Sequence, residues 1–173
     1  MRYDKHKNFS IQKEIKLISK IVPLEDFNNQ KYRENILREH FNIPETKGYY
    51  GPDFDNGSFK TVTISPTKKN TYNITKGKTL GIMGRIDKEE THDNLNTIFG
   101  VFNKNGNLKF AILVRADENL NQLFEVEKKL KQKKMRNGKN KYDGKTINFN
   151  VIFEYGLSYQ ILFKDDDVQI NLD

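Results

Sequence analysis

The chain has 173 residues and no cysteine, which excludes disulfide bonds, thiolate metal sites and cysteine nucleophiles. A hydrophobic fraction of 35% in a chain of this length is sufficient for one folded domain, and no apolar run approaches the length of a membrane span. The formal net charge of +7 favours polyanions as partners.

Helical spacing of apolar residues and alternating strand patterns predict the elements of the first half of the chain. Residues 10–22 are expected to form an amphipathic helix, and a second helix is expected over Gln30–Phe41. Ser58–Ser65 alternates and is rich in β-branched residues, which predicts a strand. The segment Lys68–Gly77 is polar, basic and short of apolar residues, whereas Leu80–Ile86 is predicted to be a further strand.

The second half begins with a predicted β-hairpin, in which Thr97–Phe102 and Leu108–Val114 flank the turn Asn103–Gly106. Asp117 is expected to cap a helix that runs to about Lys134. The remaining expected strands are Ile147–Glu154, Tyr159–Phe163 and, after the acidic run Asp165–Asp167, a short strand over Val168–Leu172. This order of elements predicts an α+β fold in one domain.

The most informative motif begins at Pro52-Asp53 and ends at Ser58-Phe59-Lys60, with the turn signal Asp55-Asn56-Gly57 between them. Residues i and i+2 of a strand point to the same face, so Ser58 and Lys60 are expected to project together. The turn would fold Asp53 back against that face. A carboxylate suits a hard cation such as Mg²⁺, and a lysine stabilises charge on an attacked phosphate. A surface hairpin without catalytic residues is the alternative interpretation.

This motif and the order of blocks around it resemble the small PvuII-type restriction endonucleases of the PD-(D/E)xK superfamily. The similarity runs from about Pro23 to Gln160, through Glu25–Gln30, Gly51–Asp53, Phe59–Ile64, Pro66–Lys69, Thr97–Phe102 and Val151–Gly156. The resemblance implies a restriction-endonuclease-like fold, with a mixed central β-sheet flanked by helices and an N-terminal helical segment. Residues 1–46 would then serve dimerisation and the minor groove, 47–164 catalysis and DNA recognition, and 165–173 would be an acidic tail.

The resemblance also implies roles for the motif residues. Asp53 and the main-chain carbonyl of Phe59 would bind Mg²⁺, and Lys60 would act on the phosphate under attack. Ser58 stands where the family has its catalytic glutamate. Glu34 is a candidate to replace that acid in part, because a helix glutamate approaches the metal in several nucleases of this superfamily. The alternative is that Glu34 is an ordinary exposed residue.

Expected DNA contacts follow from the same resemblance. Asn28 and Asn29 would lie in a loop facing the minor groove, and the other contacts would come from Lys68, Lys69, Asn73, Thr75, Lys76 and Asp143. The family's base-reading histidines and paired asparagines have no counterparts at these positions, which implies a different target sequence or weak base recognition. The basic run Lys128–Lys141 is either a solvated face or lies along phosphates.

The expected function is Mg²⁺-dependent hydrolysis of double-stranded DNA by a homodimeric type II enzyme of a restriction–modification system. We expect a cytoplasmic protein with no membrane partner and no organic cofactor, since the chain has no signal-peptide pattern and no phosphate-cradling motif. One alternative is a relative that binds DNA with weak or no catalysis, because Ser58 replaces the acid. Another is a basic RNA-binding or phage-type regulatory domain, in which Asp53 and Lys60 have no catalytic role.

Overall fold

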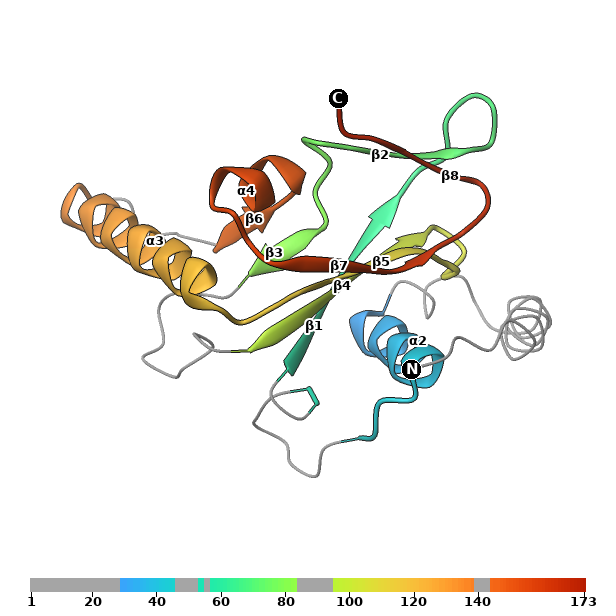
Figure 1. The fold of residues 1–173 in the computed structure, drawn as a ribbon, viewed down its shortest axis with the longest axis horizontal. Coiled ribbons are helices and arrows are strands. Elements are labelled where there is room, and N and C mark those ends of the chain that lie inside the picture. Colours follow the sequence, from blue (N-terminus) through green and yellow to red (C-terminus); the bar gives the residue numbers. More distant parts are fainter. Residues whose placement is uncertain (1–28, 46–52, 55–56, 84–94, 139–143) are drawn as a thin grey trace.

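The computed structural model describes residues 29–45, 53–54, 57–83, 95–138 and 144–173. The helix expected over 10–22 lies outside the described residues, as do Asn28 and Asp143. The described chain is mixed α+β, with a mixed central sheet whose two faces are covered by different helices (Figure 1).

The central sheet has four strands in the order β1-β4-β5-β7. Strand β1, Gly57–Ile64, pairs in parallel with β4, Asn96–Asn103. Strand β4 pairs antiparallel with β5, Leu108–Val114, which in turn pairs antiparallel with β7, Tyr159–Lys164. The predicted strand after Asp53 and the predicted β4–β5 hairpin are confirmed within one residue at each end.

Two small ribbons complete the β-structure of the described residues. Strand β2, Tyr72–Thr75, pairs in parallel with β8, Val168–Asn171. Strand β3, Gly81–Met83, pairs antiparallel with β6, Lys145–Ile147. The short strand predicted after the acidic run is confirmed as β8, whereas its partner β2 lies inside the basic segment where no strand was expected.

The two long helices begin directly after the residues whose side chains cap them. Helix α2 spans Gln30–Phe41, and the Asn29 side chain accepts a hydrogen bond from the Lys31 N–H at 2.9 Å. Helix α3 spans Glu118–Arg136, capped by Asp117. Both helices match their predictions, with α3 two residues longer. No helix of the described residues is long and apolar enough to cross a membrane.

The strand predicted over Ile147–Glu154 is wrong, because the chain turns into a short helix there. Strand β6 ends at Ile147, and helix α4 follows over Phe149–Glu154. The Asn148 side chain accepts a hydrogen bond from the Val151 N–H at 3.0 Å and so caps α4. Phe149 and Ile152, three residues apart, are both buried, which is the spacing of a helix that packs on a core.

The core lies on both faces of the sheet. On one face Leu37 of α2 packs with residues that include Phe59 and Phe102. On the other face Leu120 of α3 and Phe149 of α4 belong to a second cluster. Helix α2 approaches β4 closely, since a Cβ added at Gly100 would lie 2.9 Å from a methyl carbon of Leu37. This contact fixes the distance between α2 and the sheet, and with it the place of the polar residues on α2.

Candidate active site

Asp53 lies against the first strand, as the sequence predicts. The Phe54 and Gly57 main chains exchange two hydrogen bonds of 3.1 and 3.0 Å around residues 55 and 56. This bridge places the Asp53 carboxylate against β1, where its Oδ2 accepts a hydrogen bond from the Phe59 N–H at 2.7 Å. Asp53 therefore lies beside the middle residue of Ser58-Phe59-Lys60.

Strand β1 is an edge strand of the four-stranded sheet, so half of its main-chain groups have no neighbour in that sheet. The Phe59 N–H points toward Asp53 and thus away from β4. In an extended strand the N–H and C=O of one residue point to the same side, so the Phe59 carbonyl also faces this edge. One carboxylate and one carbonyl oxygen are brought to the same edge of the sheet.

Ser58 and Lys60 share a face of β1, opposite to the Phe59 side chain. The Phe59 ring is fully buried with α2, whereas Lys60 is half-buried and Ser58 is 8% exposed. Lys60 lies next to β3, since a Cβ added at Gly81 would be 3.1 Å from the Lys60 Cβ. The Ser58 position therefore points the same way as Lys60, but it supplies a hydroxyl in place of a carboxylate.

Glu34 of α2 shares the electrostatic environment of Asp53 and Lys60. Burial raises the pKa of the Glu34 carboxyl, the Gln30 hydrogen bond lowers it, the negative charge of Asp53 raises it, and the charge of Lys60 lowers it. The net pKa is raised above the ordinary value. The Gln30 bond is 2.7 Å long and holds one Glu34 oxygen. The charges of Asp53 and Lys60, from separate parts of the chain, thus both act on the Glu34 carboxyl.

Two arginines hold α2 on β1. The Arg33 guanidinium donates to the Thr63 hydroxyl at 2.7 Å, and that of Arg38 lies 5.2 Å from the centre of the Phe59 ring. Arg38 was not among the predicted site residues, although its place one helical turn after Glu34 is a detectable signal. Its positive charge lowers the Glu34 pKa, which makes it part of the same cluster.

The oxygen atoms at this edge suit a hard divalent cation. Asp53, Glu34 and the Phe59 carbonyl are all oxygen donors, and Mg²⁺ is usually held by one or two carboxylates together with substrate oxygens. No group of three or more histidine, cysteine or acidic side chains that could hold a metal occurs among the described residues. A cation at this edge would therefore depend on the carbonyl and on substrate oxygens.

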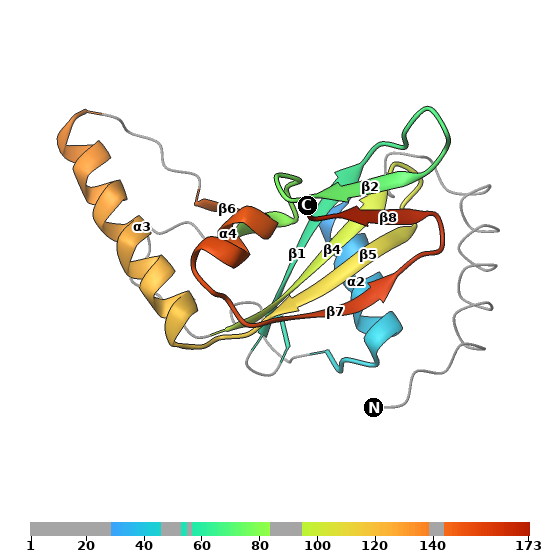
Figure 2. The ribbon, with the colours of Figure 1, turned by 45° about the horizontal axis from the view of Figure 1, so that its top comes forward.

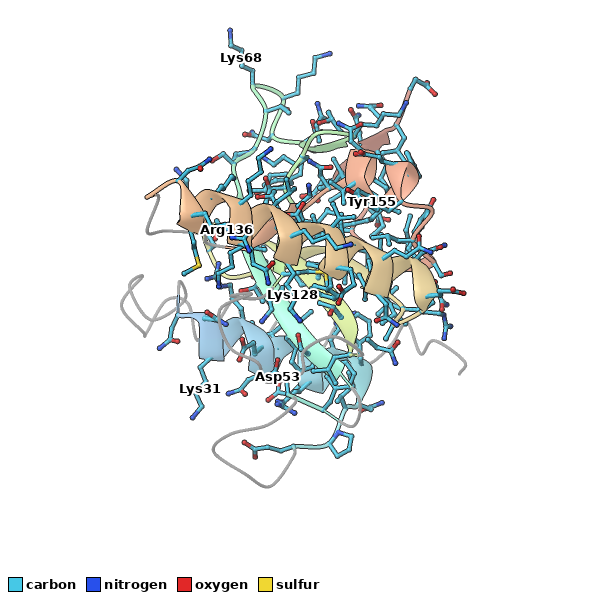
Figure 3. All side chains as sticks on the ribbon, turned by 90° about the vertical axis from the view of Figure 1, so that its left-hand side faces the viewer. Lys31, Asp53, Lys68, Lys128, Arg136 and Tyr155 are labelled. Atoms are coloured by element: carbon cyan, nitrogen blue, oxygen red, sulfur yellow. The ribbon has the colours of Figure 1, made fainter. Side chains whose placement is uncertain are left out.

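The residues expected to contact DNA do not form one surface around Asp53. The Asn29 side-chain oxygen caps α2 by accepting a hydrogen bond from the Lys31 N–H. Lys68 and Lys69 are exposed in the turn beyond the far end of β1, a strand that spans roughly 25 Å (Figure 3). The others lie on β2 or just after it: Asn73 is half-buried, Thr75 is exposed and Lys76 is half-buried.

A polar cluster that the sequence analysis missed joins β5 to the segment before β8. The Lys109 ammonium lies 2.8 Å from Asp165 and 2.7 Å from Asp167, and 4.9 Å from the centre of the Tyr72 ring. More than fifty residues separate the lysine from the aspartates, so no local sequence pattern predicts the contact. Two of the three residues in the acidic run after β7, Asp165 and Asp167, are therefore ion-paired with the central sheet.

Comparisons with protein-family models, curated proteins and solved structures find no match to this chain. The geometry of the β1 edge and its charges are thus the basis for a functional proposal.

Proposed function

We propose that the protein is a divalent-metal-dependent endonuclease of double-stranded DNA, with a restriction-endonuclease-like fold. The observation that carries the proposal is the hydrogen bond of Asp53 to the Phe59 main chain, beside Lys60 and within the electrostatic reach of Glu34. The same set of groups, an oxygen-lined edge next to a lysine, is what phosphodiester hydrolysis requires. The net charge of +7 supports a nucleic-acid substrate.

Each residue has a distinct part in this proposal. Asp53, Glu34 and the Phe59 carbonyl would hold Mg²⁺, which when bound neutralises charge developing on the phosphate. Lys60 donates hydrogen bonds to the phosphate oxygen or orients the attacking water. Glu34 lies within the electrostatic reach of Asp53 and Lys60, so its carboxylate would be the second one beside the cation. A homodimer with two-fold symmetry would present one such edge to each DNA strand.

The test separates chemistry from binding. Lys60→Ala should lower the single-turnover cleavage rate of plasmid DNA on the order of 10² to 10³-fold, because it removes a preorganised donor. Asp53→Asn should do the same, while gel-shift affinity without metal stays nearly unchanged or rises slightly. Lys104→Ala, in the exposed turn after β4, serves as the control. If both variants cleave like the parent, the β1 edge is not the active site.

A second candidate is a protein that binds DNA without cleaving it, and the buried Ser58 hydroxyl favours it. Under this hypothesis the parent does not cleave with Mg²⁺ or Mn²⁺, and Ser58→Glu restores a carboxylate on the Lys60 face. The substitution should tighten Mg²⁺ binding and create or raise cleavage. Ser58→Gln has the same size without the charge and should do neither. Equal behaviour of the two variants would contradict the alignment of Ser58 with a metal ligand.

A further inference from the structure

Helix α3 divides into a packed half and an exposed half. Its buried residues are Leu120, Leu123, Phe124, Glu127 and Lys131. From Gln132 to Gly138 every residue is exposed. Figures 1 and 2 show the helix extending away from the sheet at this end. The exposed half therefore adds no buried side chain to the described core, and packing does not explain its length.

The last nine residues of α3, which include the buried Lys131, are strongly basic. Six of the nine residues from 128 to 136 are lysine or arginine, and no acidic residue occurs among them. Like charges three or four residues apart on a helix repel, as at Lys128 and Lys131 or Lys129 and Lys133. This repulsion weakens the helix slightly, and a polyanion bound along it would relieve the repulsion.

Four of the exposed basic residues lie on one side of α3. At 100° per residue, Lys128, Lys129, Lys133 and Arg136 fall within about 140° of the helix circumference, on the side opposite the buried residues. From Lys128 to Arg136 the helix rises about 12 Å, and a DNA duplex presents roughly seven phosphate charges over that length. The basic face thus matches a phosphodiester backbone in length and in sign.

We infer that this basic face of α3, made of Lys128, Lys129, Lys133 and Arg136, binds the backbone phosphates of duplex DNA. The choice of DNA rests on the proposed function. Viewed from the side of α3, the helix crosses the molecule between the loop of Lys68 and the end of β1 that carries Asp53 (Figure 3). A duplex along the helix contacts phosphates and not bases, so the face contributes affinity without sequence choice.

The charge arrangement argues against an anionic membrane as the partner. A helix that lies on a membrane needs an apolar face beside its basic one. The exposed apolar residues here, Val126, Leu130 and Met135, do not form a continuous face, since at 100° per residue Met135 falls about 140° from Leu130.

The experiment measures binding of a fluorescent DNA duplex to the full chain across a salt series without divalent metal. The triple variant Lys128→Gln, Lys129→Gln, Lys133→Gln should bind on the order of 100-fold more weakly at low salt. Its log–log salt slope should be less steep by roughly 2 to 3 units, because each phosphate contact contributes about 0.9. The control Lys31→Gln, Lys104→Gln, Arg115→Gln removes the same charge from exposed residues on other segments and should change the slope by less than one unit.

The outcomes distinguish this inference from the proposed function. The inference is wrong if the two triple variants have equal log–log salt slopes, or if the parent does not bind duplex DNA. The same loss on anionic vesicles or RNA, with none on DNA, also overturns it. A parent that binds through α3 but never cleaves keeps the inference and overturns the nuclease. A thermal melt of each variant excludes unfolding, since removing like charges should leave the helix as stable or more so.

Discussion

At the scale of single residues, Glu34 lowers the stability of the fold when it is ionised, although its proposed role requires the ionised form. Its pKa is raised mainly by burial, so the folded protein holds the proton more tightly than the unfolded chain. Stability therefore falls as pH rises from the unfolded pKa through the raised folded pKa, and the penalty persists above it. A carboxylate kept at such a cost is suited to a site that uses it.

Glu34→Gln should accordingly be as stable as the parent or more stable at neutral pH. Its free energy of unfolding should also lack the decline with rising pH that Glu34 causes. The same substitution should lower DNA cleavage on the order of 100-fold, because it removes one carboxylate from the edge near Asp53. Urea unfolding at several pH values and single-turnover cleavage measure the two effects. Glu39→Gln, on the exposed side of the same helix, is the matched control. A variant that loses stability and activity together would point to a structural role alone.

At the scale of elements, the cap of α4 decides whether its residues form a helix. The segment after Asn148 contains Val151, Ile152 and Phe153, which favour strands, and the helix has only six residues. Asn148→Ala should therefore lower the free energy of unfolding by about 1 kcal/mol and the melting temperature by about 2 to 4 °C. Asn148→Asp keeps the acceptor and should retain most of the stability. Equal melting temperatures for both variants and the parent would show that packing alone holds α4.

The same elements show why the sequence predicts some structure and not the rest. The cap of Asp117 and the turn Asn103–Gly106 are local signals, so α3 and the β4–β5 hairpin are predicted closely. Strand β2 has two buried residues among basic neighbours, and only its pairing with β8 makes it a strand. Strand β2 thus takes its structure from a distant partner that no local window contains, whereas the Asn148 cap of α4 is a local signal within a run of strand-favouring residues.

In the candidate site, too, one part is predictable from local sequence and another is not. The turn after Asp53 is local, so its return to Phe59 follows from the sequence. The approach of Glu34 depends on how α2 packs on the sheet, through the contact between Leu37 and Gly100. Those two residues are more than sixty positions apart, so only the resemblance suggested Glu34 in advance.

At the scale of the whole molecule, Lys109 links three distant parts of the chain. It lies on β5, pairs with Asp165 and Asp167 before β8, and its ammonium faces the Tyr72 ring of β2. Burial alone would lower the Lys109 pKa, but the hydrogen bonds and charges of the two aspartates outweigh it and raise the pKa. A raised folded pKa means that this stabilisation is present below the unfolded value of 10.5 and is lost as pH rises through the folded value.

Lys109→Met should destabilise the protein on the order of 2 kcal/mol, because it leaves two partly buried carboxylates without their cation. Oδ1 of Asp167 already has no hydrogen-bond partner among the described residues, so the loss of Lys109 would leave that side chain with less compensation. The triple variant Lys109→Met, Asp165→Asn, Asp167→Asn should recover part of the loss, since no unpaired charge remains. Urea unfolding at neutral and alkaline pH measures both effects, and the alkaline decline due to Lys109 should vanish in both variants. A triple variant less stable than Lys109→Met alone would mean that the aspartates stabilise the β2–β8 ribbon by some route other than this lysine.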